Sequence, residues 1–213
     1  MHRLSEYIAI IPGFADPKMF AVLQSCVLNQ SLGKRVHIPT HKRGVTIPYS
    51  EIRRSYPEIA RFYQSESLAG RISEIARIGV LPTPLHDQSS CSVLIYDQPG
   101  DRIGWHFDHN FYNGRHFTAL LPVLNEQRSK GCLSSAELIV RVRGDVVTVP
   151  TPPNSMVLFE GAFVRHTVTP LGPDERRVIL SMTFCSNPTT RPLRDLQRRF
   201  KDIAYLGVRA LWT

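Results

Sequence analysis

The second half of the chain consists of short runs of hydrophobic and polar residues in alternation, separated by turn residues. From residue 92 onward this pattern predicts about eight strands. The runs span residues 92–96, 103–108, 116–125, 137–143, 146–150, 156–159, 164–168 and 177–185. Turn residues such as Pro99-Gly100-Asp101 stand between them. Strands this short and this regularly interrupted favour a double-sheet jelly roll.

The first third has a different pattern, with apolar residues at helical spacing. After a short apolar run at 7–11, Asp16 and Pro17 supply the cap and the first residue of a helix. Residues 51–79 also read as helix, broken near Pro57. Between them, residues 34–43 carry lysines, arginines and histidines beside a proline, so we expect a loop there.

The end of the chain returns to helix. Leu193, Leu196, Phe200 and Ile203 fall on one side, which predicts a helix packed on the outside of the sheet. We therefore expect a mostly β protein, with a double-stranded β-helix (jelly roll) core, a helical N-terminal third and a C-terminal helix. One domain, 1–213, would comprise a helical support region at 1–85, the core at 86–187 and the C-terminal helix at 188–213.

The overall composition is that of a globular protein. Hydrophobic residues make up 42% and charged residues 21% of the 213 residues, which excludes a disordered chain. The net charge of +8 makes an acidic partner conceivable. Charge alone does not separate nucleic acid, anionic metabolites and membrane surfaces, and no motif points to nucleic acid.

The cysteines and the N-terminus bear on the compartment. Cys26, Cys91, Cys132 and Cys185 are widely spaced, without a C-x-x-C pair for zinc or redox chemistry, so we expect reduced thiols. The apolar run at 7–11 is too short for a signal peptide or a membrane span. We expect a cytoplasmic protein.

The residues that suggest chemistry lie at 104–109, Gly-Trp-His-Phe-Asp-His, and at a distant histidine. On a strand, side chains two apart face the same side, so His106 and Asp108 direct an imidazole and a carboxylate to one point. With His166 they would form a 2-His-1-carboxylate facial triad, which is typical of non-haem Fe(II) oxygenases. By itself, one H-x-D in a chain with eight histidines is weak evidence.

Further residues at fixed spacings strengthen this interpretation. Tyr96 and Gly100 lie ten and six residues before His106, and Arg177 lies eleven residues after His166. With these residues the chain resembles the 2-oxoglutarate/Fe(II)-dependent dioxygenase superfamily, and within it the prolyl-4-hydroxylase-like branch. The resemblance is firm over residues 92–185 and loose over the first third.

The resemblance implies a set of cofactors and ligands. Fe(II) would be held by the catalytic residues His106, Asp108 and His166, and 2-oxoglutarate and O2 would be cosubstrates. The guanidinium of Arg177 would bind the far carboxylate of 2-oxoglutarate, since its planar fork of donors matches a carboxylate. The hydroxyl of Tyr96 would add a hydrogen bond to the cosubstrate, unless this tyrosine is only packed in the core.

Some positions depart from the family pattern. Arg177 and Ser181 match the strand motif Arg-x-x-x-Thr/Ser, whereas Arg176 alternates to the opposite face. Ile179 stands where other branches carry the serine or asparagine of Arg-x-Ser or Arg-x-Asn. Asn154 stands where glycine is common, in a turn that asparagine tolerates.

Asp108 also bears on the outcome of the reaction. Halogenating relatives have a small residue at the carboxylate position, so that a halide binds the iron. The carboxylate here therefore favours hydroxylation, with succinate and CO2 as products of the cosubstrate.

The loop after the predicted ligand strand is the candidate for substrate recognition. Residues 108–117 are rich in aromatic and hydrogen-bonding side chains, and loops at the mouth of a barrel often bind substrate. We expect Asn110, Tyr112 and Arg115 to contact substrate. The small size of the chain favours an amino acid or another small molecule over a protein side chain.

Two other functions remain open at this point. A cupin-like metalloprotein without an oxo-acid partly fits Gly100 and His106, although Asp108 stands where a histidine is expected. A catalytically silent basic module would only bind an acidic partner, and the complete candidate triad argues against it.

Overall fold

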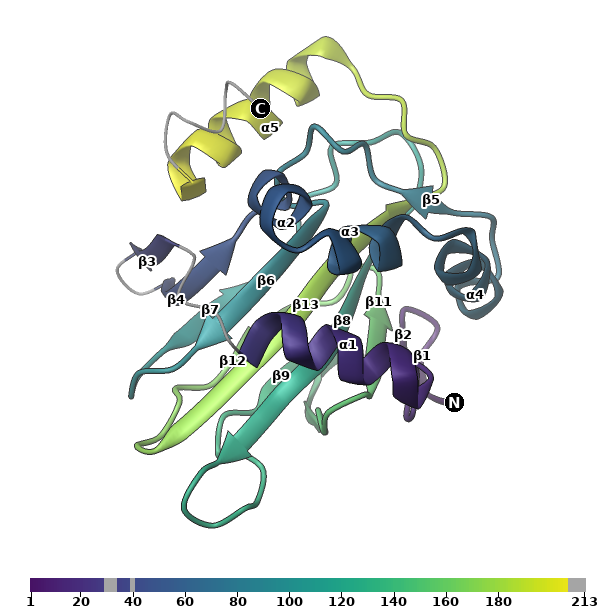
Figure 1. Cartoon of the computed structure of the whole chain (residues 1–213). Coiled ribbons are helices and arrows are strands. Elements are labelled where there is room, and N and C mark those ends of the chain that lie inside the picture. Colours follow the sequence, from purple (N-terminus) through teal and green to yellow (C-terminus); the bar gives the residue numbers. More distant parts are fainter. Residues whose placement is uncertain (29–33, 39–40, 207–213) are drawn as a thin grey trace.

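Among the described residues, thirteen strands form one sheet, accompanied by five helices (Figure 1). The computed structural model describes residues 1–28, 34–38 and 41–206, with the backbone alone for Lys34 and residues 203–206. The strands are β1 (His2–Ser5), β2 (Ile8–Ile11), β3 (Lys34–Ile38), β4 (Lys42–Ile47), β5 (Leu81–Pro82), β6 (Cys91–Tyr96), β7 (Arg102–His106), β8 (His116–Gln127), β9 (Leu138–Val142), β10 (Asp145–Val149), β11 (Met156–Phe159), β12 (His166–Val168) and β13 (Glu175–Cys185). The helices are α1 (Pro17–Leu28), α2 (Tyr49–Ser55), α3 (Pro57–Gln64), α4 (Glu66–Ala76) and α5 (Pro192–Leu206).

The sheet curls back on itself. Its order is β1-β2-β11-β8-β13-β6-β4-β7-β12-β9-β10, with β3 on β4 and β5 on β13. Strand β4 pairs with both β6 and β7 and so connects the two halves. Side chains from both halves meet in one apolar cluster, which includes Phe159 from β11, Leu138 from β9 and Ile103 from β7. This arrangement confirms the predicted jelly roll.

Strand β8 lies at the centre of the larger half, between β11 and β13. Because successive side chains of a strand face opposite sides, Ala119 and Leu121 join the core beneath the helices, whereas Thr118 and Leu120 face the inside of the curl. Strand β8 thus contributes side chains both to the core beneath the helices and to the inside of the curl.

Helices α1 to α4 cover the outer face of the larger half (Figure 1). Their apolar faces, with Leu23, Ile59 and Ile72, pack on outward-facing strand residues such as Leu121 and Leu180. The predicted cap of α1 is confirmed, since the Asp16 carboxylate accepts hydrogen bonds from the backbone N–H groups of residues 18 and 19.

The N-terminal third contains more strand than its sequence predicts. Strands β1 to β4 all lie within residues 1–85 and join the main sheet, so the core extends beyond residues 86–187. The predicted loop at 34–43 is wrong at 34–38 and 42–43, where β3 and β4 pair antiparallel, with Val36 buried and His37 exposed; residues 39–40 lie outside the described residues. The predicted helix at 51–79 is present as three helices, and Pro57 begins the second of them.

Helix α5 turns its polar side toward the rest of the protein, whereas the sequence predicted that its apolar side packs there. Leu193, Leu196 and Phe200 are 67%, 49% and 61% exposed, so this apolar side does not pack on the sheet. The inner side is polar instead: Arg198 is buried, donates to the carbonyl of His86 and pairs with acidic residues of its own helix. The side chain of Ile203 lies outside the described residues.

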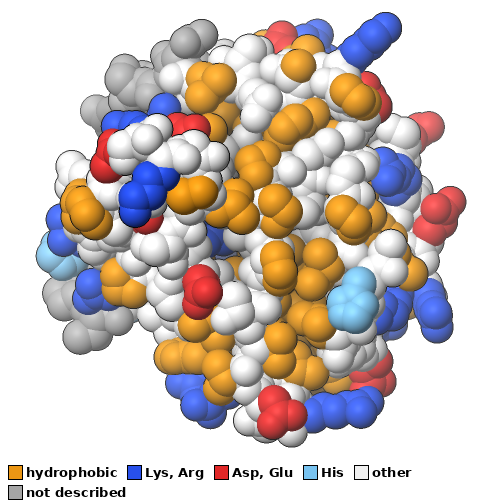
Figure 2. Space-filling view, turned by 90° about the horizontal axis from the view of Figure 1, so that it is seen from below, with side chains coloured by type: hydrophobic (Ala, Val, Ile, Leu, Met, Phe, Trp, Pro, Cys, Tyr) orange, Lys and Arg blue, Asp and Glu red, His pale blue; other side chains and the backbone are white. Residues whose placement is uncertain are grey.

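One end of the molecule shows how its charged and hydrophobic side chains are distributed. On the end of the molecule away from α5, hydrophobic side chains occupy the middle and lysines and arginines stand apart around the edge (Figure 2). This face therefore has no continuous basic patch. Within the described part of the chain, no helix is long and apolar enough to cross a membrane.

Candidate metal centre and cavity

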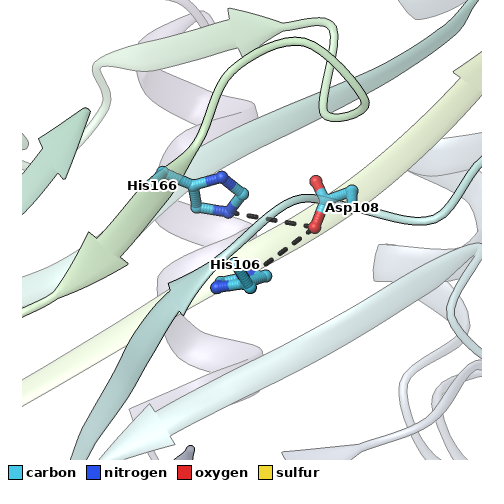
Figure 3. Close-up of side chains that lie close together, drawn as sticks. All are labelled: His106, Asp108 and His166. Atoms are coloured by element: carbon cyan, nitrogen blue, oxygen red, sulfur yellow. Dashed lines mark ion pairs between the residues drawn. The ribbon is translucent and has the colours of Figure 1, made fainter. Parts of the chain in front are cut away.

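The two candidate histidines come from neighbouring strands, and the aspartate comes from a loop (Figure 3). His106 ends β7 and His166 begins β12, and the two residues are direct cross-strand partners. Asp108 was expected on the same strand as His106 but lies two residues beyond its end. Its backbone N–H donates instead to the carbonyl of Gly161, at 3.0 Å. The three side chains nevertheless meet, with one candidate ligand atom from each within 4.8 Å of the others.

Backbone carbonyls orient both imidazoles. The Nδ1 of His106 lies 2.8 Å from the carbonyl oxygen of Gly104, and the Nδ1 of His166 lies 3.0 Å from that of Val164. Because a carbonyl oxygen only accepts, each Nδ1 carries the hydrogen, and in the neutral form of each ring Nε2 has the lone pair that binds a metal.

The free nitrogens face the carboxylate. The Nε2 atoms of His106 and His166 lie 3.6 and 3.8 Å from the same oxygen, Oδ1 of Asp108 (Figure 3). Lone pairs on two nitrogens and an anionic oxygen repel one another at this distance unless a cation lies between them. The donor set therefore fits a divalent metal ion.

Burial and neighbouring groups together shift the pKa values of His106 and Asp108. It lowers the pKa of His106 to about 4, and the adjacent His166 contributes to the same shift. The imidazole of His106 is consequently neutral at pH 7, the form that binds metal. Burial acts to raise the pKa of Asp108, but the two imidazoles and the Thr118 hydroxyl outweigh it and the pKa is lowered.

The cluster opens into a cavity of about 260 Å³ inside the curl of the sheet. Three lining residues on central strands, Leu94, Leu120 and Ser181, are only half-buried although their strand neighbours are buried. They face empty space in the middle of the molecule.

Arg177 and Tyr96 both line this cavity. They are cross-strand partners on β13 and β6, and their side chains are almost wholly buried. Arg177 donates from Nη1 to the carbonyl of Ala136 at 2.7 Å, while its Nε has no partner among the described residues. Burial lowers the pKa of Arg177 to about 10, so the guanidinium remains charged at pH 7. A buried cation facing a cavity suits an anionic ligand.

The three predicted substrate residues do not line the cavity, and the structure gives them other partners. Asn110 closes its own loop by bonding to Tyr112 N–H and to the Gly114 carbonyl. Tyr112 is 1% exposed and donates its hydroxyl to Asp87, at 2.9 Å. Arg115 pairs with the buried Glu160. The side chains of all three residues therefore bond to other parts of the protein.

Other residues, which the sequence did not indicate, line the cavity. Asp87 pairs with Lys201 of α5 at 3.3 Å, and Lys201 also donates to Ser89. His116 is buried, and burial lowers its pKa. Asp87 and Lys201 are 114 residues apart in the chain, and no periodic pattern connects them.

Lys42 and Thr118 are two further lining residues that the sequence did not indicate. Lys42 of β4 lines the cavity, and burial lowers its pKa to about 8. Thr118 of β8 donates its hydroxyl to Oδ2 of Asp108 at 2.6 Å. Neither residue stands at a spacing that marks it in the sequence.

In sequence, one family model matches part of the chain. The sequence model of the family described as "HalD: Halogenase D" matches residues 20–114, a segment that ends just beyond the H-x-D pair. No curated protein matches the chain.

Solved structures match most of the chain. An oxidoreductase of the 2OG-Fe(II) oxygenase family from Burkholderia pseudomallei superposes with a TM-score of 0.67 and 12% identity, covering 87% of this chain and 88% of that one. A prolyl hydroxylase from Trichoplax adhaerens, in complex with a peptide of hypoxia inducible factor, has a TM-score of 0.63 and 18% identity, with 85% and 84% covered. The epimerase SnoN, in complex with Fe3+, alpha ketoglutarate and nogalamycin RO, has a TM-score of 0.62 and 12% identity, with 84% and 78% covered. The chain has the fold of the 2-oxoglutarate/Fe(II)-dependent oxygenases.

The likeness to these oxygenases, prolyl hydroxylases among them, is one of fold, because the identities are low. It covers more than three quarters of each of these three proteins. Within this oxygenase fold, the His106, Asp108 and His166 cluster and the cavity lie inside the jelly roll.

Proposed function

We propose that the protein is an Fe(II)- and 2-oxoglutarate-dependent oxygenase. The observation that carries the proposal is the convergence of two imidazole nitrogens and one carboxylate oxygen at the wall of a cavity. This donor set is the 2-His-1-carboxylate triad of non-haem Fe(II) sites, with His106, Asp108 and His166 as ligands. When bound, iron with 2-oxoglutarate and O2 supplies oxidative decarboxylation to succinate and CO2, coupled to oxidation of the substrate.

Arg177 is the proposed anchor for 2-oxoglutarate. It is a fixed, buried cation in the same cavity as the triad, and no carboxylate of the described residues pairs with it. A dicarboxylate that binds metal at one end would neutralise Arg177 at the other. Tyr96, its cross-strand partner, is the proposed hydrogen-bond donor beside it.

Hydroxylation is the proposed outcome, although halogenation deserves a test because of the match to the Halogenase D family. The carboxylate of Asp108 points at the two imidazoles and is packed against Gly161, so it occupies the place that a halide would need. Turnover in the presence of chloride should therefore give hydroxylated product. Chlorinated product, detected by mass spectrometry, would contradict this proposal.

The proposed substrate is an amino acid or another small molecule. A cavity of about 260 Å³ suits a small ligand beside the cosubstrate. Its lining combines apolar residues such as Leu94 with polar ones such as Ser92 and His116, so a substrate with both kinds of group would fit. A protein side chain remains the alternative, since the prolyl hydroxylase from Trichoplax adhaerens binds a peptide.

An anaerobic titration tests the proposal. Metal-free protein would receive Fe(II) and then 2-oxoglutarate, while visible absorption is followed for the weak charge-transfer band of an iron-chelated oxo-acid. We expect the band with the wild type and its loss with His106→Ala. His37→Ala, which removes an exposed histidine of β3, is the matched control and should keep the band.

The result separates the three functions. Iron binding without the band would contradict the use of 2-oxoglutarate and favour a cupin-like metalloprotein. Absence of iron binding would favour a basic binding module, which should then bind an acidic partner with steep salt dependence. With the band established, succinate release in the presence of candidate small molecules would identify the substrate.

A further inference from the structure

We propose that Thr118 is a positioning residue for the metal centre: its hydroxyl holds one oxygen of Asp108, so that the other oxygen faces the two imidazoles. The inference rests on the proposed function, because it assigns a role toward the same metal site. It concerns a residue of β8 that is not itself a ligand.

The contacts of the two carboxylate oxygens are different. Oδ2 accepts the hydroxyl hydrogen of Thr118 at 2.6 Å, a short hydrogen bond to a charged acceptor. Oδ1 is the oxygen that lies 3.6 and 3.8 Å from the Nε2 atoms of His106 and His166. The hydrogen bond thus decides which oxygen is presented to the metal position.

Asp108 needs such support because its backbone is outside the sheet. The two histidines start from paired strands, whereas Asp108 follows the end of β7 by two residues. Thr118 is 4% exposed and lies on the central strand, paired with Phe159 on one side and Thr183 on the other. A rigid strand therefore fixes the rotamer of a side chain in a loop.

Gly161 restrains Asp108 from another side. Its carbonyl accepts the Asp108 N–H, and a Cβ built on Gly161 would lie 2.4 Å from both Cβ and Oδ2 of Asp108. No side chain fits there without displacing the carboxylate. The loop is fixed in turn through the adjacent Glu160, which is buried and pairs with Arg115.

The test compares Thr118→Val with Thr118→Ser, using Co(II) as the probe because its visible absorption reports the ligands around it. Valine keeps the shape of threonine and removes the hydroxyl, whereas serine keeps the hydroxyl. We expect Thr118→Val to weaken Co(II) binding by about ten- to a hundredfold and to change the spectrum, as is typical when a partner of a metal ligand is lost. Thr118→Ser should restore both.

Thr183→Val is the matched control. Thr183 is also buried, lines the same cavity and hydrogen-bonds through its hydroxyl, but to Thr83 rather than to Asp108. The Thr183→Val variant should bind Co(II) with the affinity and spectrum of the wild type. Wild-type binding by Thr118→Val, or an equal loss in both valine variants, would overturn the proposal.

Gly161→Ala gives a second, independent measurement if Thr118→Val does not fold. It adds one methyl group against the carboxylate at a residue without a positive φ, and should also weaken Co(II) binding. Unchanged binding would show that the orientation of Asp108 does not matter. If wild-type protein binds Co(II) but gives no 2-oxoglutarate band, the proposed function fails while the Thr118 comparison still decides this inference. If it binds no metal, both fail.

Discussion

His166 is the direct cross-strand partner of His106, and their ring centroids are 4.1 Å apart. The pairing of β12 with β7 thus brings together two residues that lie 60 positions apart in the sequence. Each ring is also hydrogen-bonded to a carbonyl two residues before it, so backbone geometry contributes directly to the orientation of both imidazoles.

Replacing Arg177 should separate cosubstrate binding from metal binding. Arg177→Ala removes a buried cation that lines the cavity and changes none of the three candidate ligands, so we expect 2-oxoglutarate affinity to fall about ten- to a hundredfold with unchanged Fe(II) affinity. Titration of the anaerobic charge-transfer band with 2-oxoglutarate would measure the cosubstrate affinity, and titration with Fe(II) at saturating 2-oxoglutarate would measure the Fe(II) affinity. Arg176→Ala, which changes the adjacent residue on the opposite face, is the control. Unchanged cosubstrate affinity in Arg177→Ala would disprove the assignment.

Acid should destabilise the metal-free protein through His106. Its pKa is about 4 in the folded chain against an ordinary value of 6.5. Between these values the unfolded chain binds a proton that the folded chain does not, so the free energy of unfolding falls as the pH falls from about 6.5 to about 4. The full effect is on the order of 3 kcal/mol.

Urea denaturation of metal-free protein at a series of pH values would measure this slope. His106→Gln should have a shallower dependence over that range, because glutamine does not titrate. His37→Gln, on the surface of β3, should retain the wild-type dependence. Equal slopes in all three proteins would mean that another group accounts for the acid sensitivity.

Helix α5 should tolerate changes on its apolar side better than on its polar side. Phe200→Ser alters an exposed residue and should change the free energy of unfolding by no more than about 0.5 kcal/mol. Arg198→Met removes one of the two cations that pair with the buried Asp202, the other being Lys201, and should cost roughly 1–3 kcal/mol. Thermal unfolding of both variants would compare them, and a reversed order would mean that the outer side packs on something in solution.

Asn154 should stabilise the turn before β11 in two ways, through its backbone conformation and through the hydrogen bonds of its side chain. Its φ is +63°, which glycine also adopts, but its side chain forms two hydrogen bonds with the backbone of Ala15. We therefore expect Asn154→Gly to lower the free energy of unfolding by roughly 1–2 kcal/mol. Asn154→Ala should be worse, because alanine is strained at this φ. Denaturant unfolding of the pair would distinguish the two contributions.

Much of the fold is predictable from sequence because the strands of a jelly roll have one face in the core. Alternation therefore located β6 to β13 within a few residues. It failed at β3 and β4, where cations and a proline interrupt the pattern and the strand pair depends on contacts with β6 and β7. At α5 the sequence pattern failed for a different reason. The apolar stripe predicted that this side of the helix is buried, whereas the buried side carries Arg198 and Lys201, which form ion pairs.

The candidate site was predictable only where the signal is local or carried by family spacing. H-x-D is local, and His166 and Arg177 stand at spacings of the family that the chain resembles. Asp87 and Lys201 had no such signal, because only the folded chain brings them together. For Tyr112 the sequence was ambiguous, because an aromatic residue in a loop is equally suited to contact substrate or to be buried, and the structure buries it against Asp87.

The two-sided role of strand β8 limits which mutations this protein tolerates. Its alternate residues belong to the core beneath the helices and to the wall of the cavity, with Ala119 on one side and Thr118 on the other. A slip of this strand by one position would put a hydroxyl in the core and a methyl group at Asp108. Any sequence change that shifts the register of β8 would therefore disturb the packing of the core and the support of Asp108 in the same step.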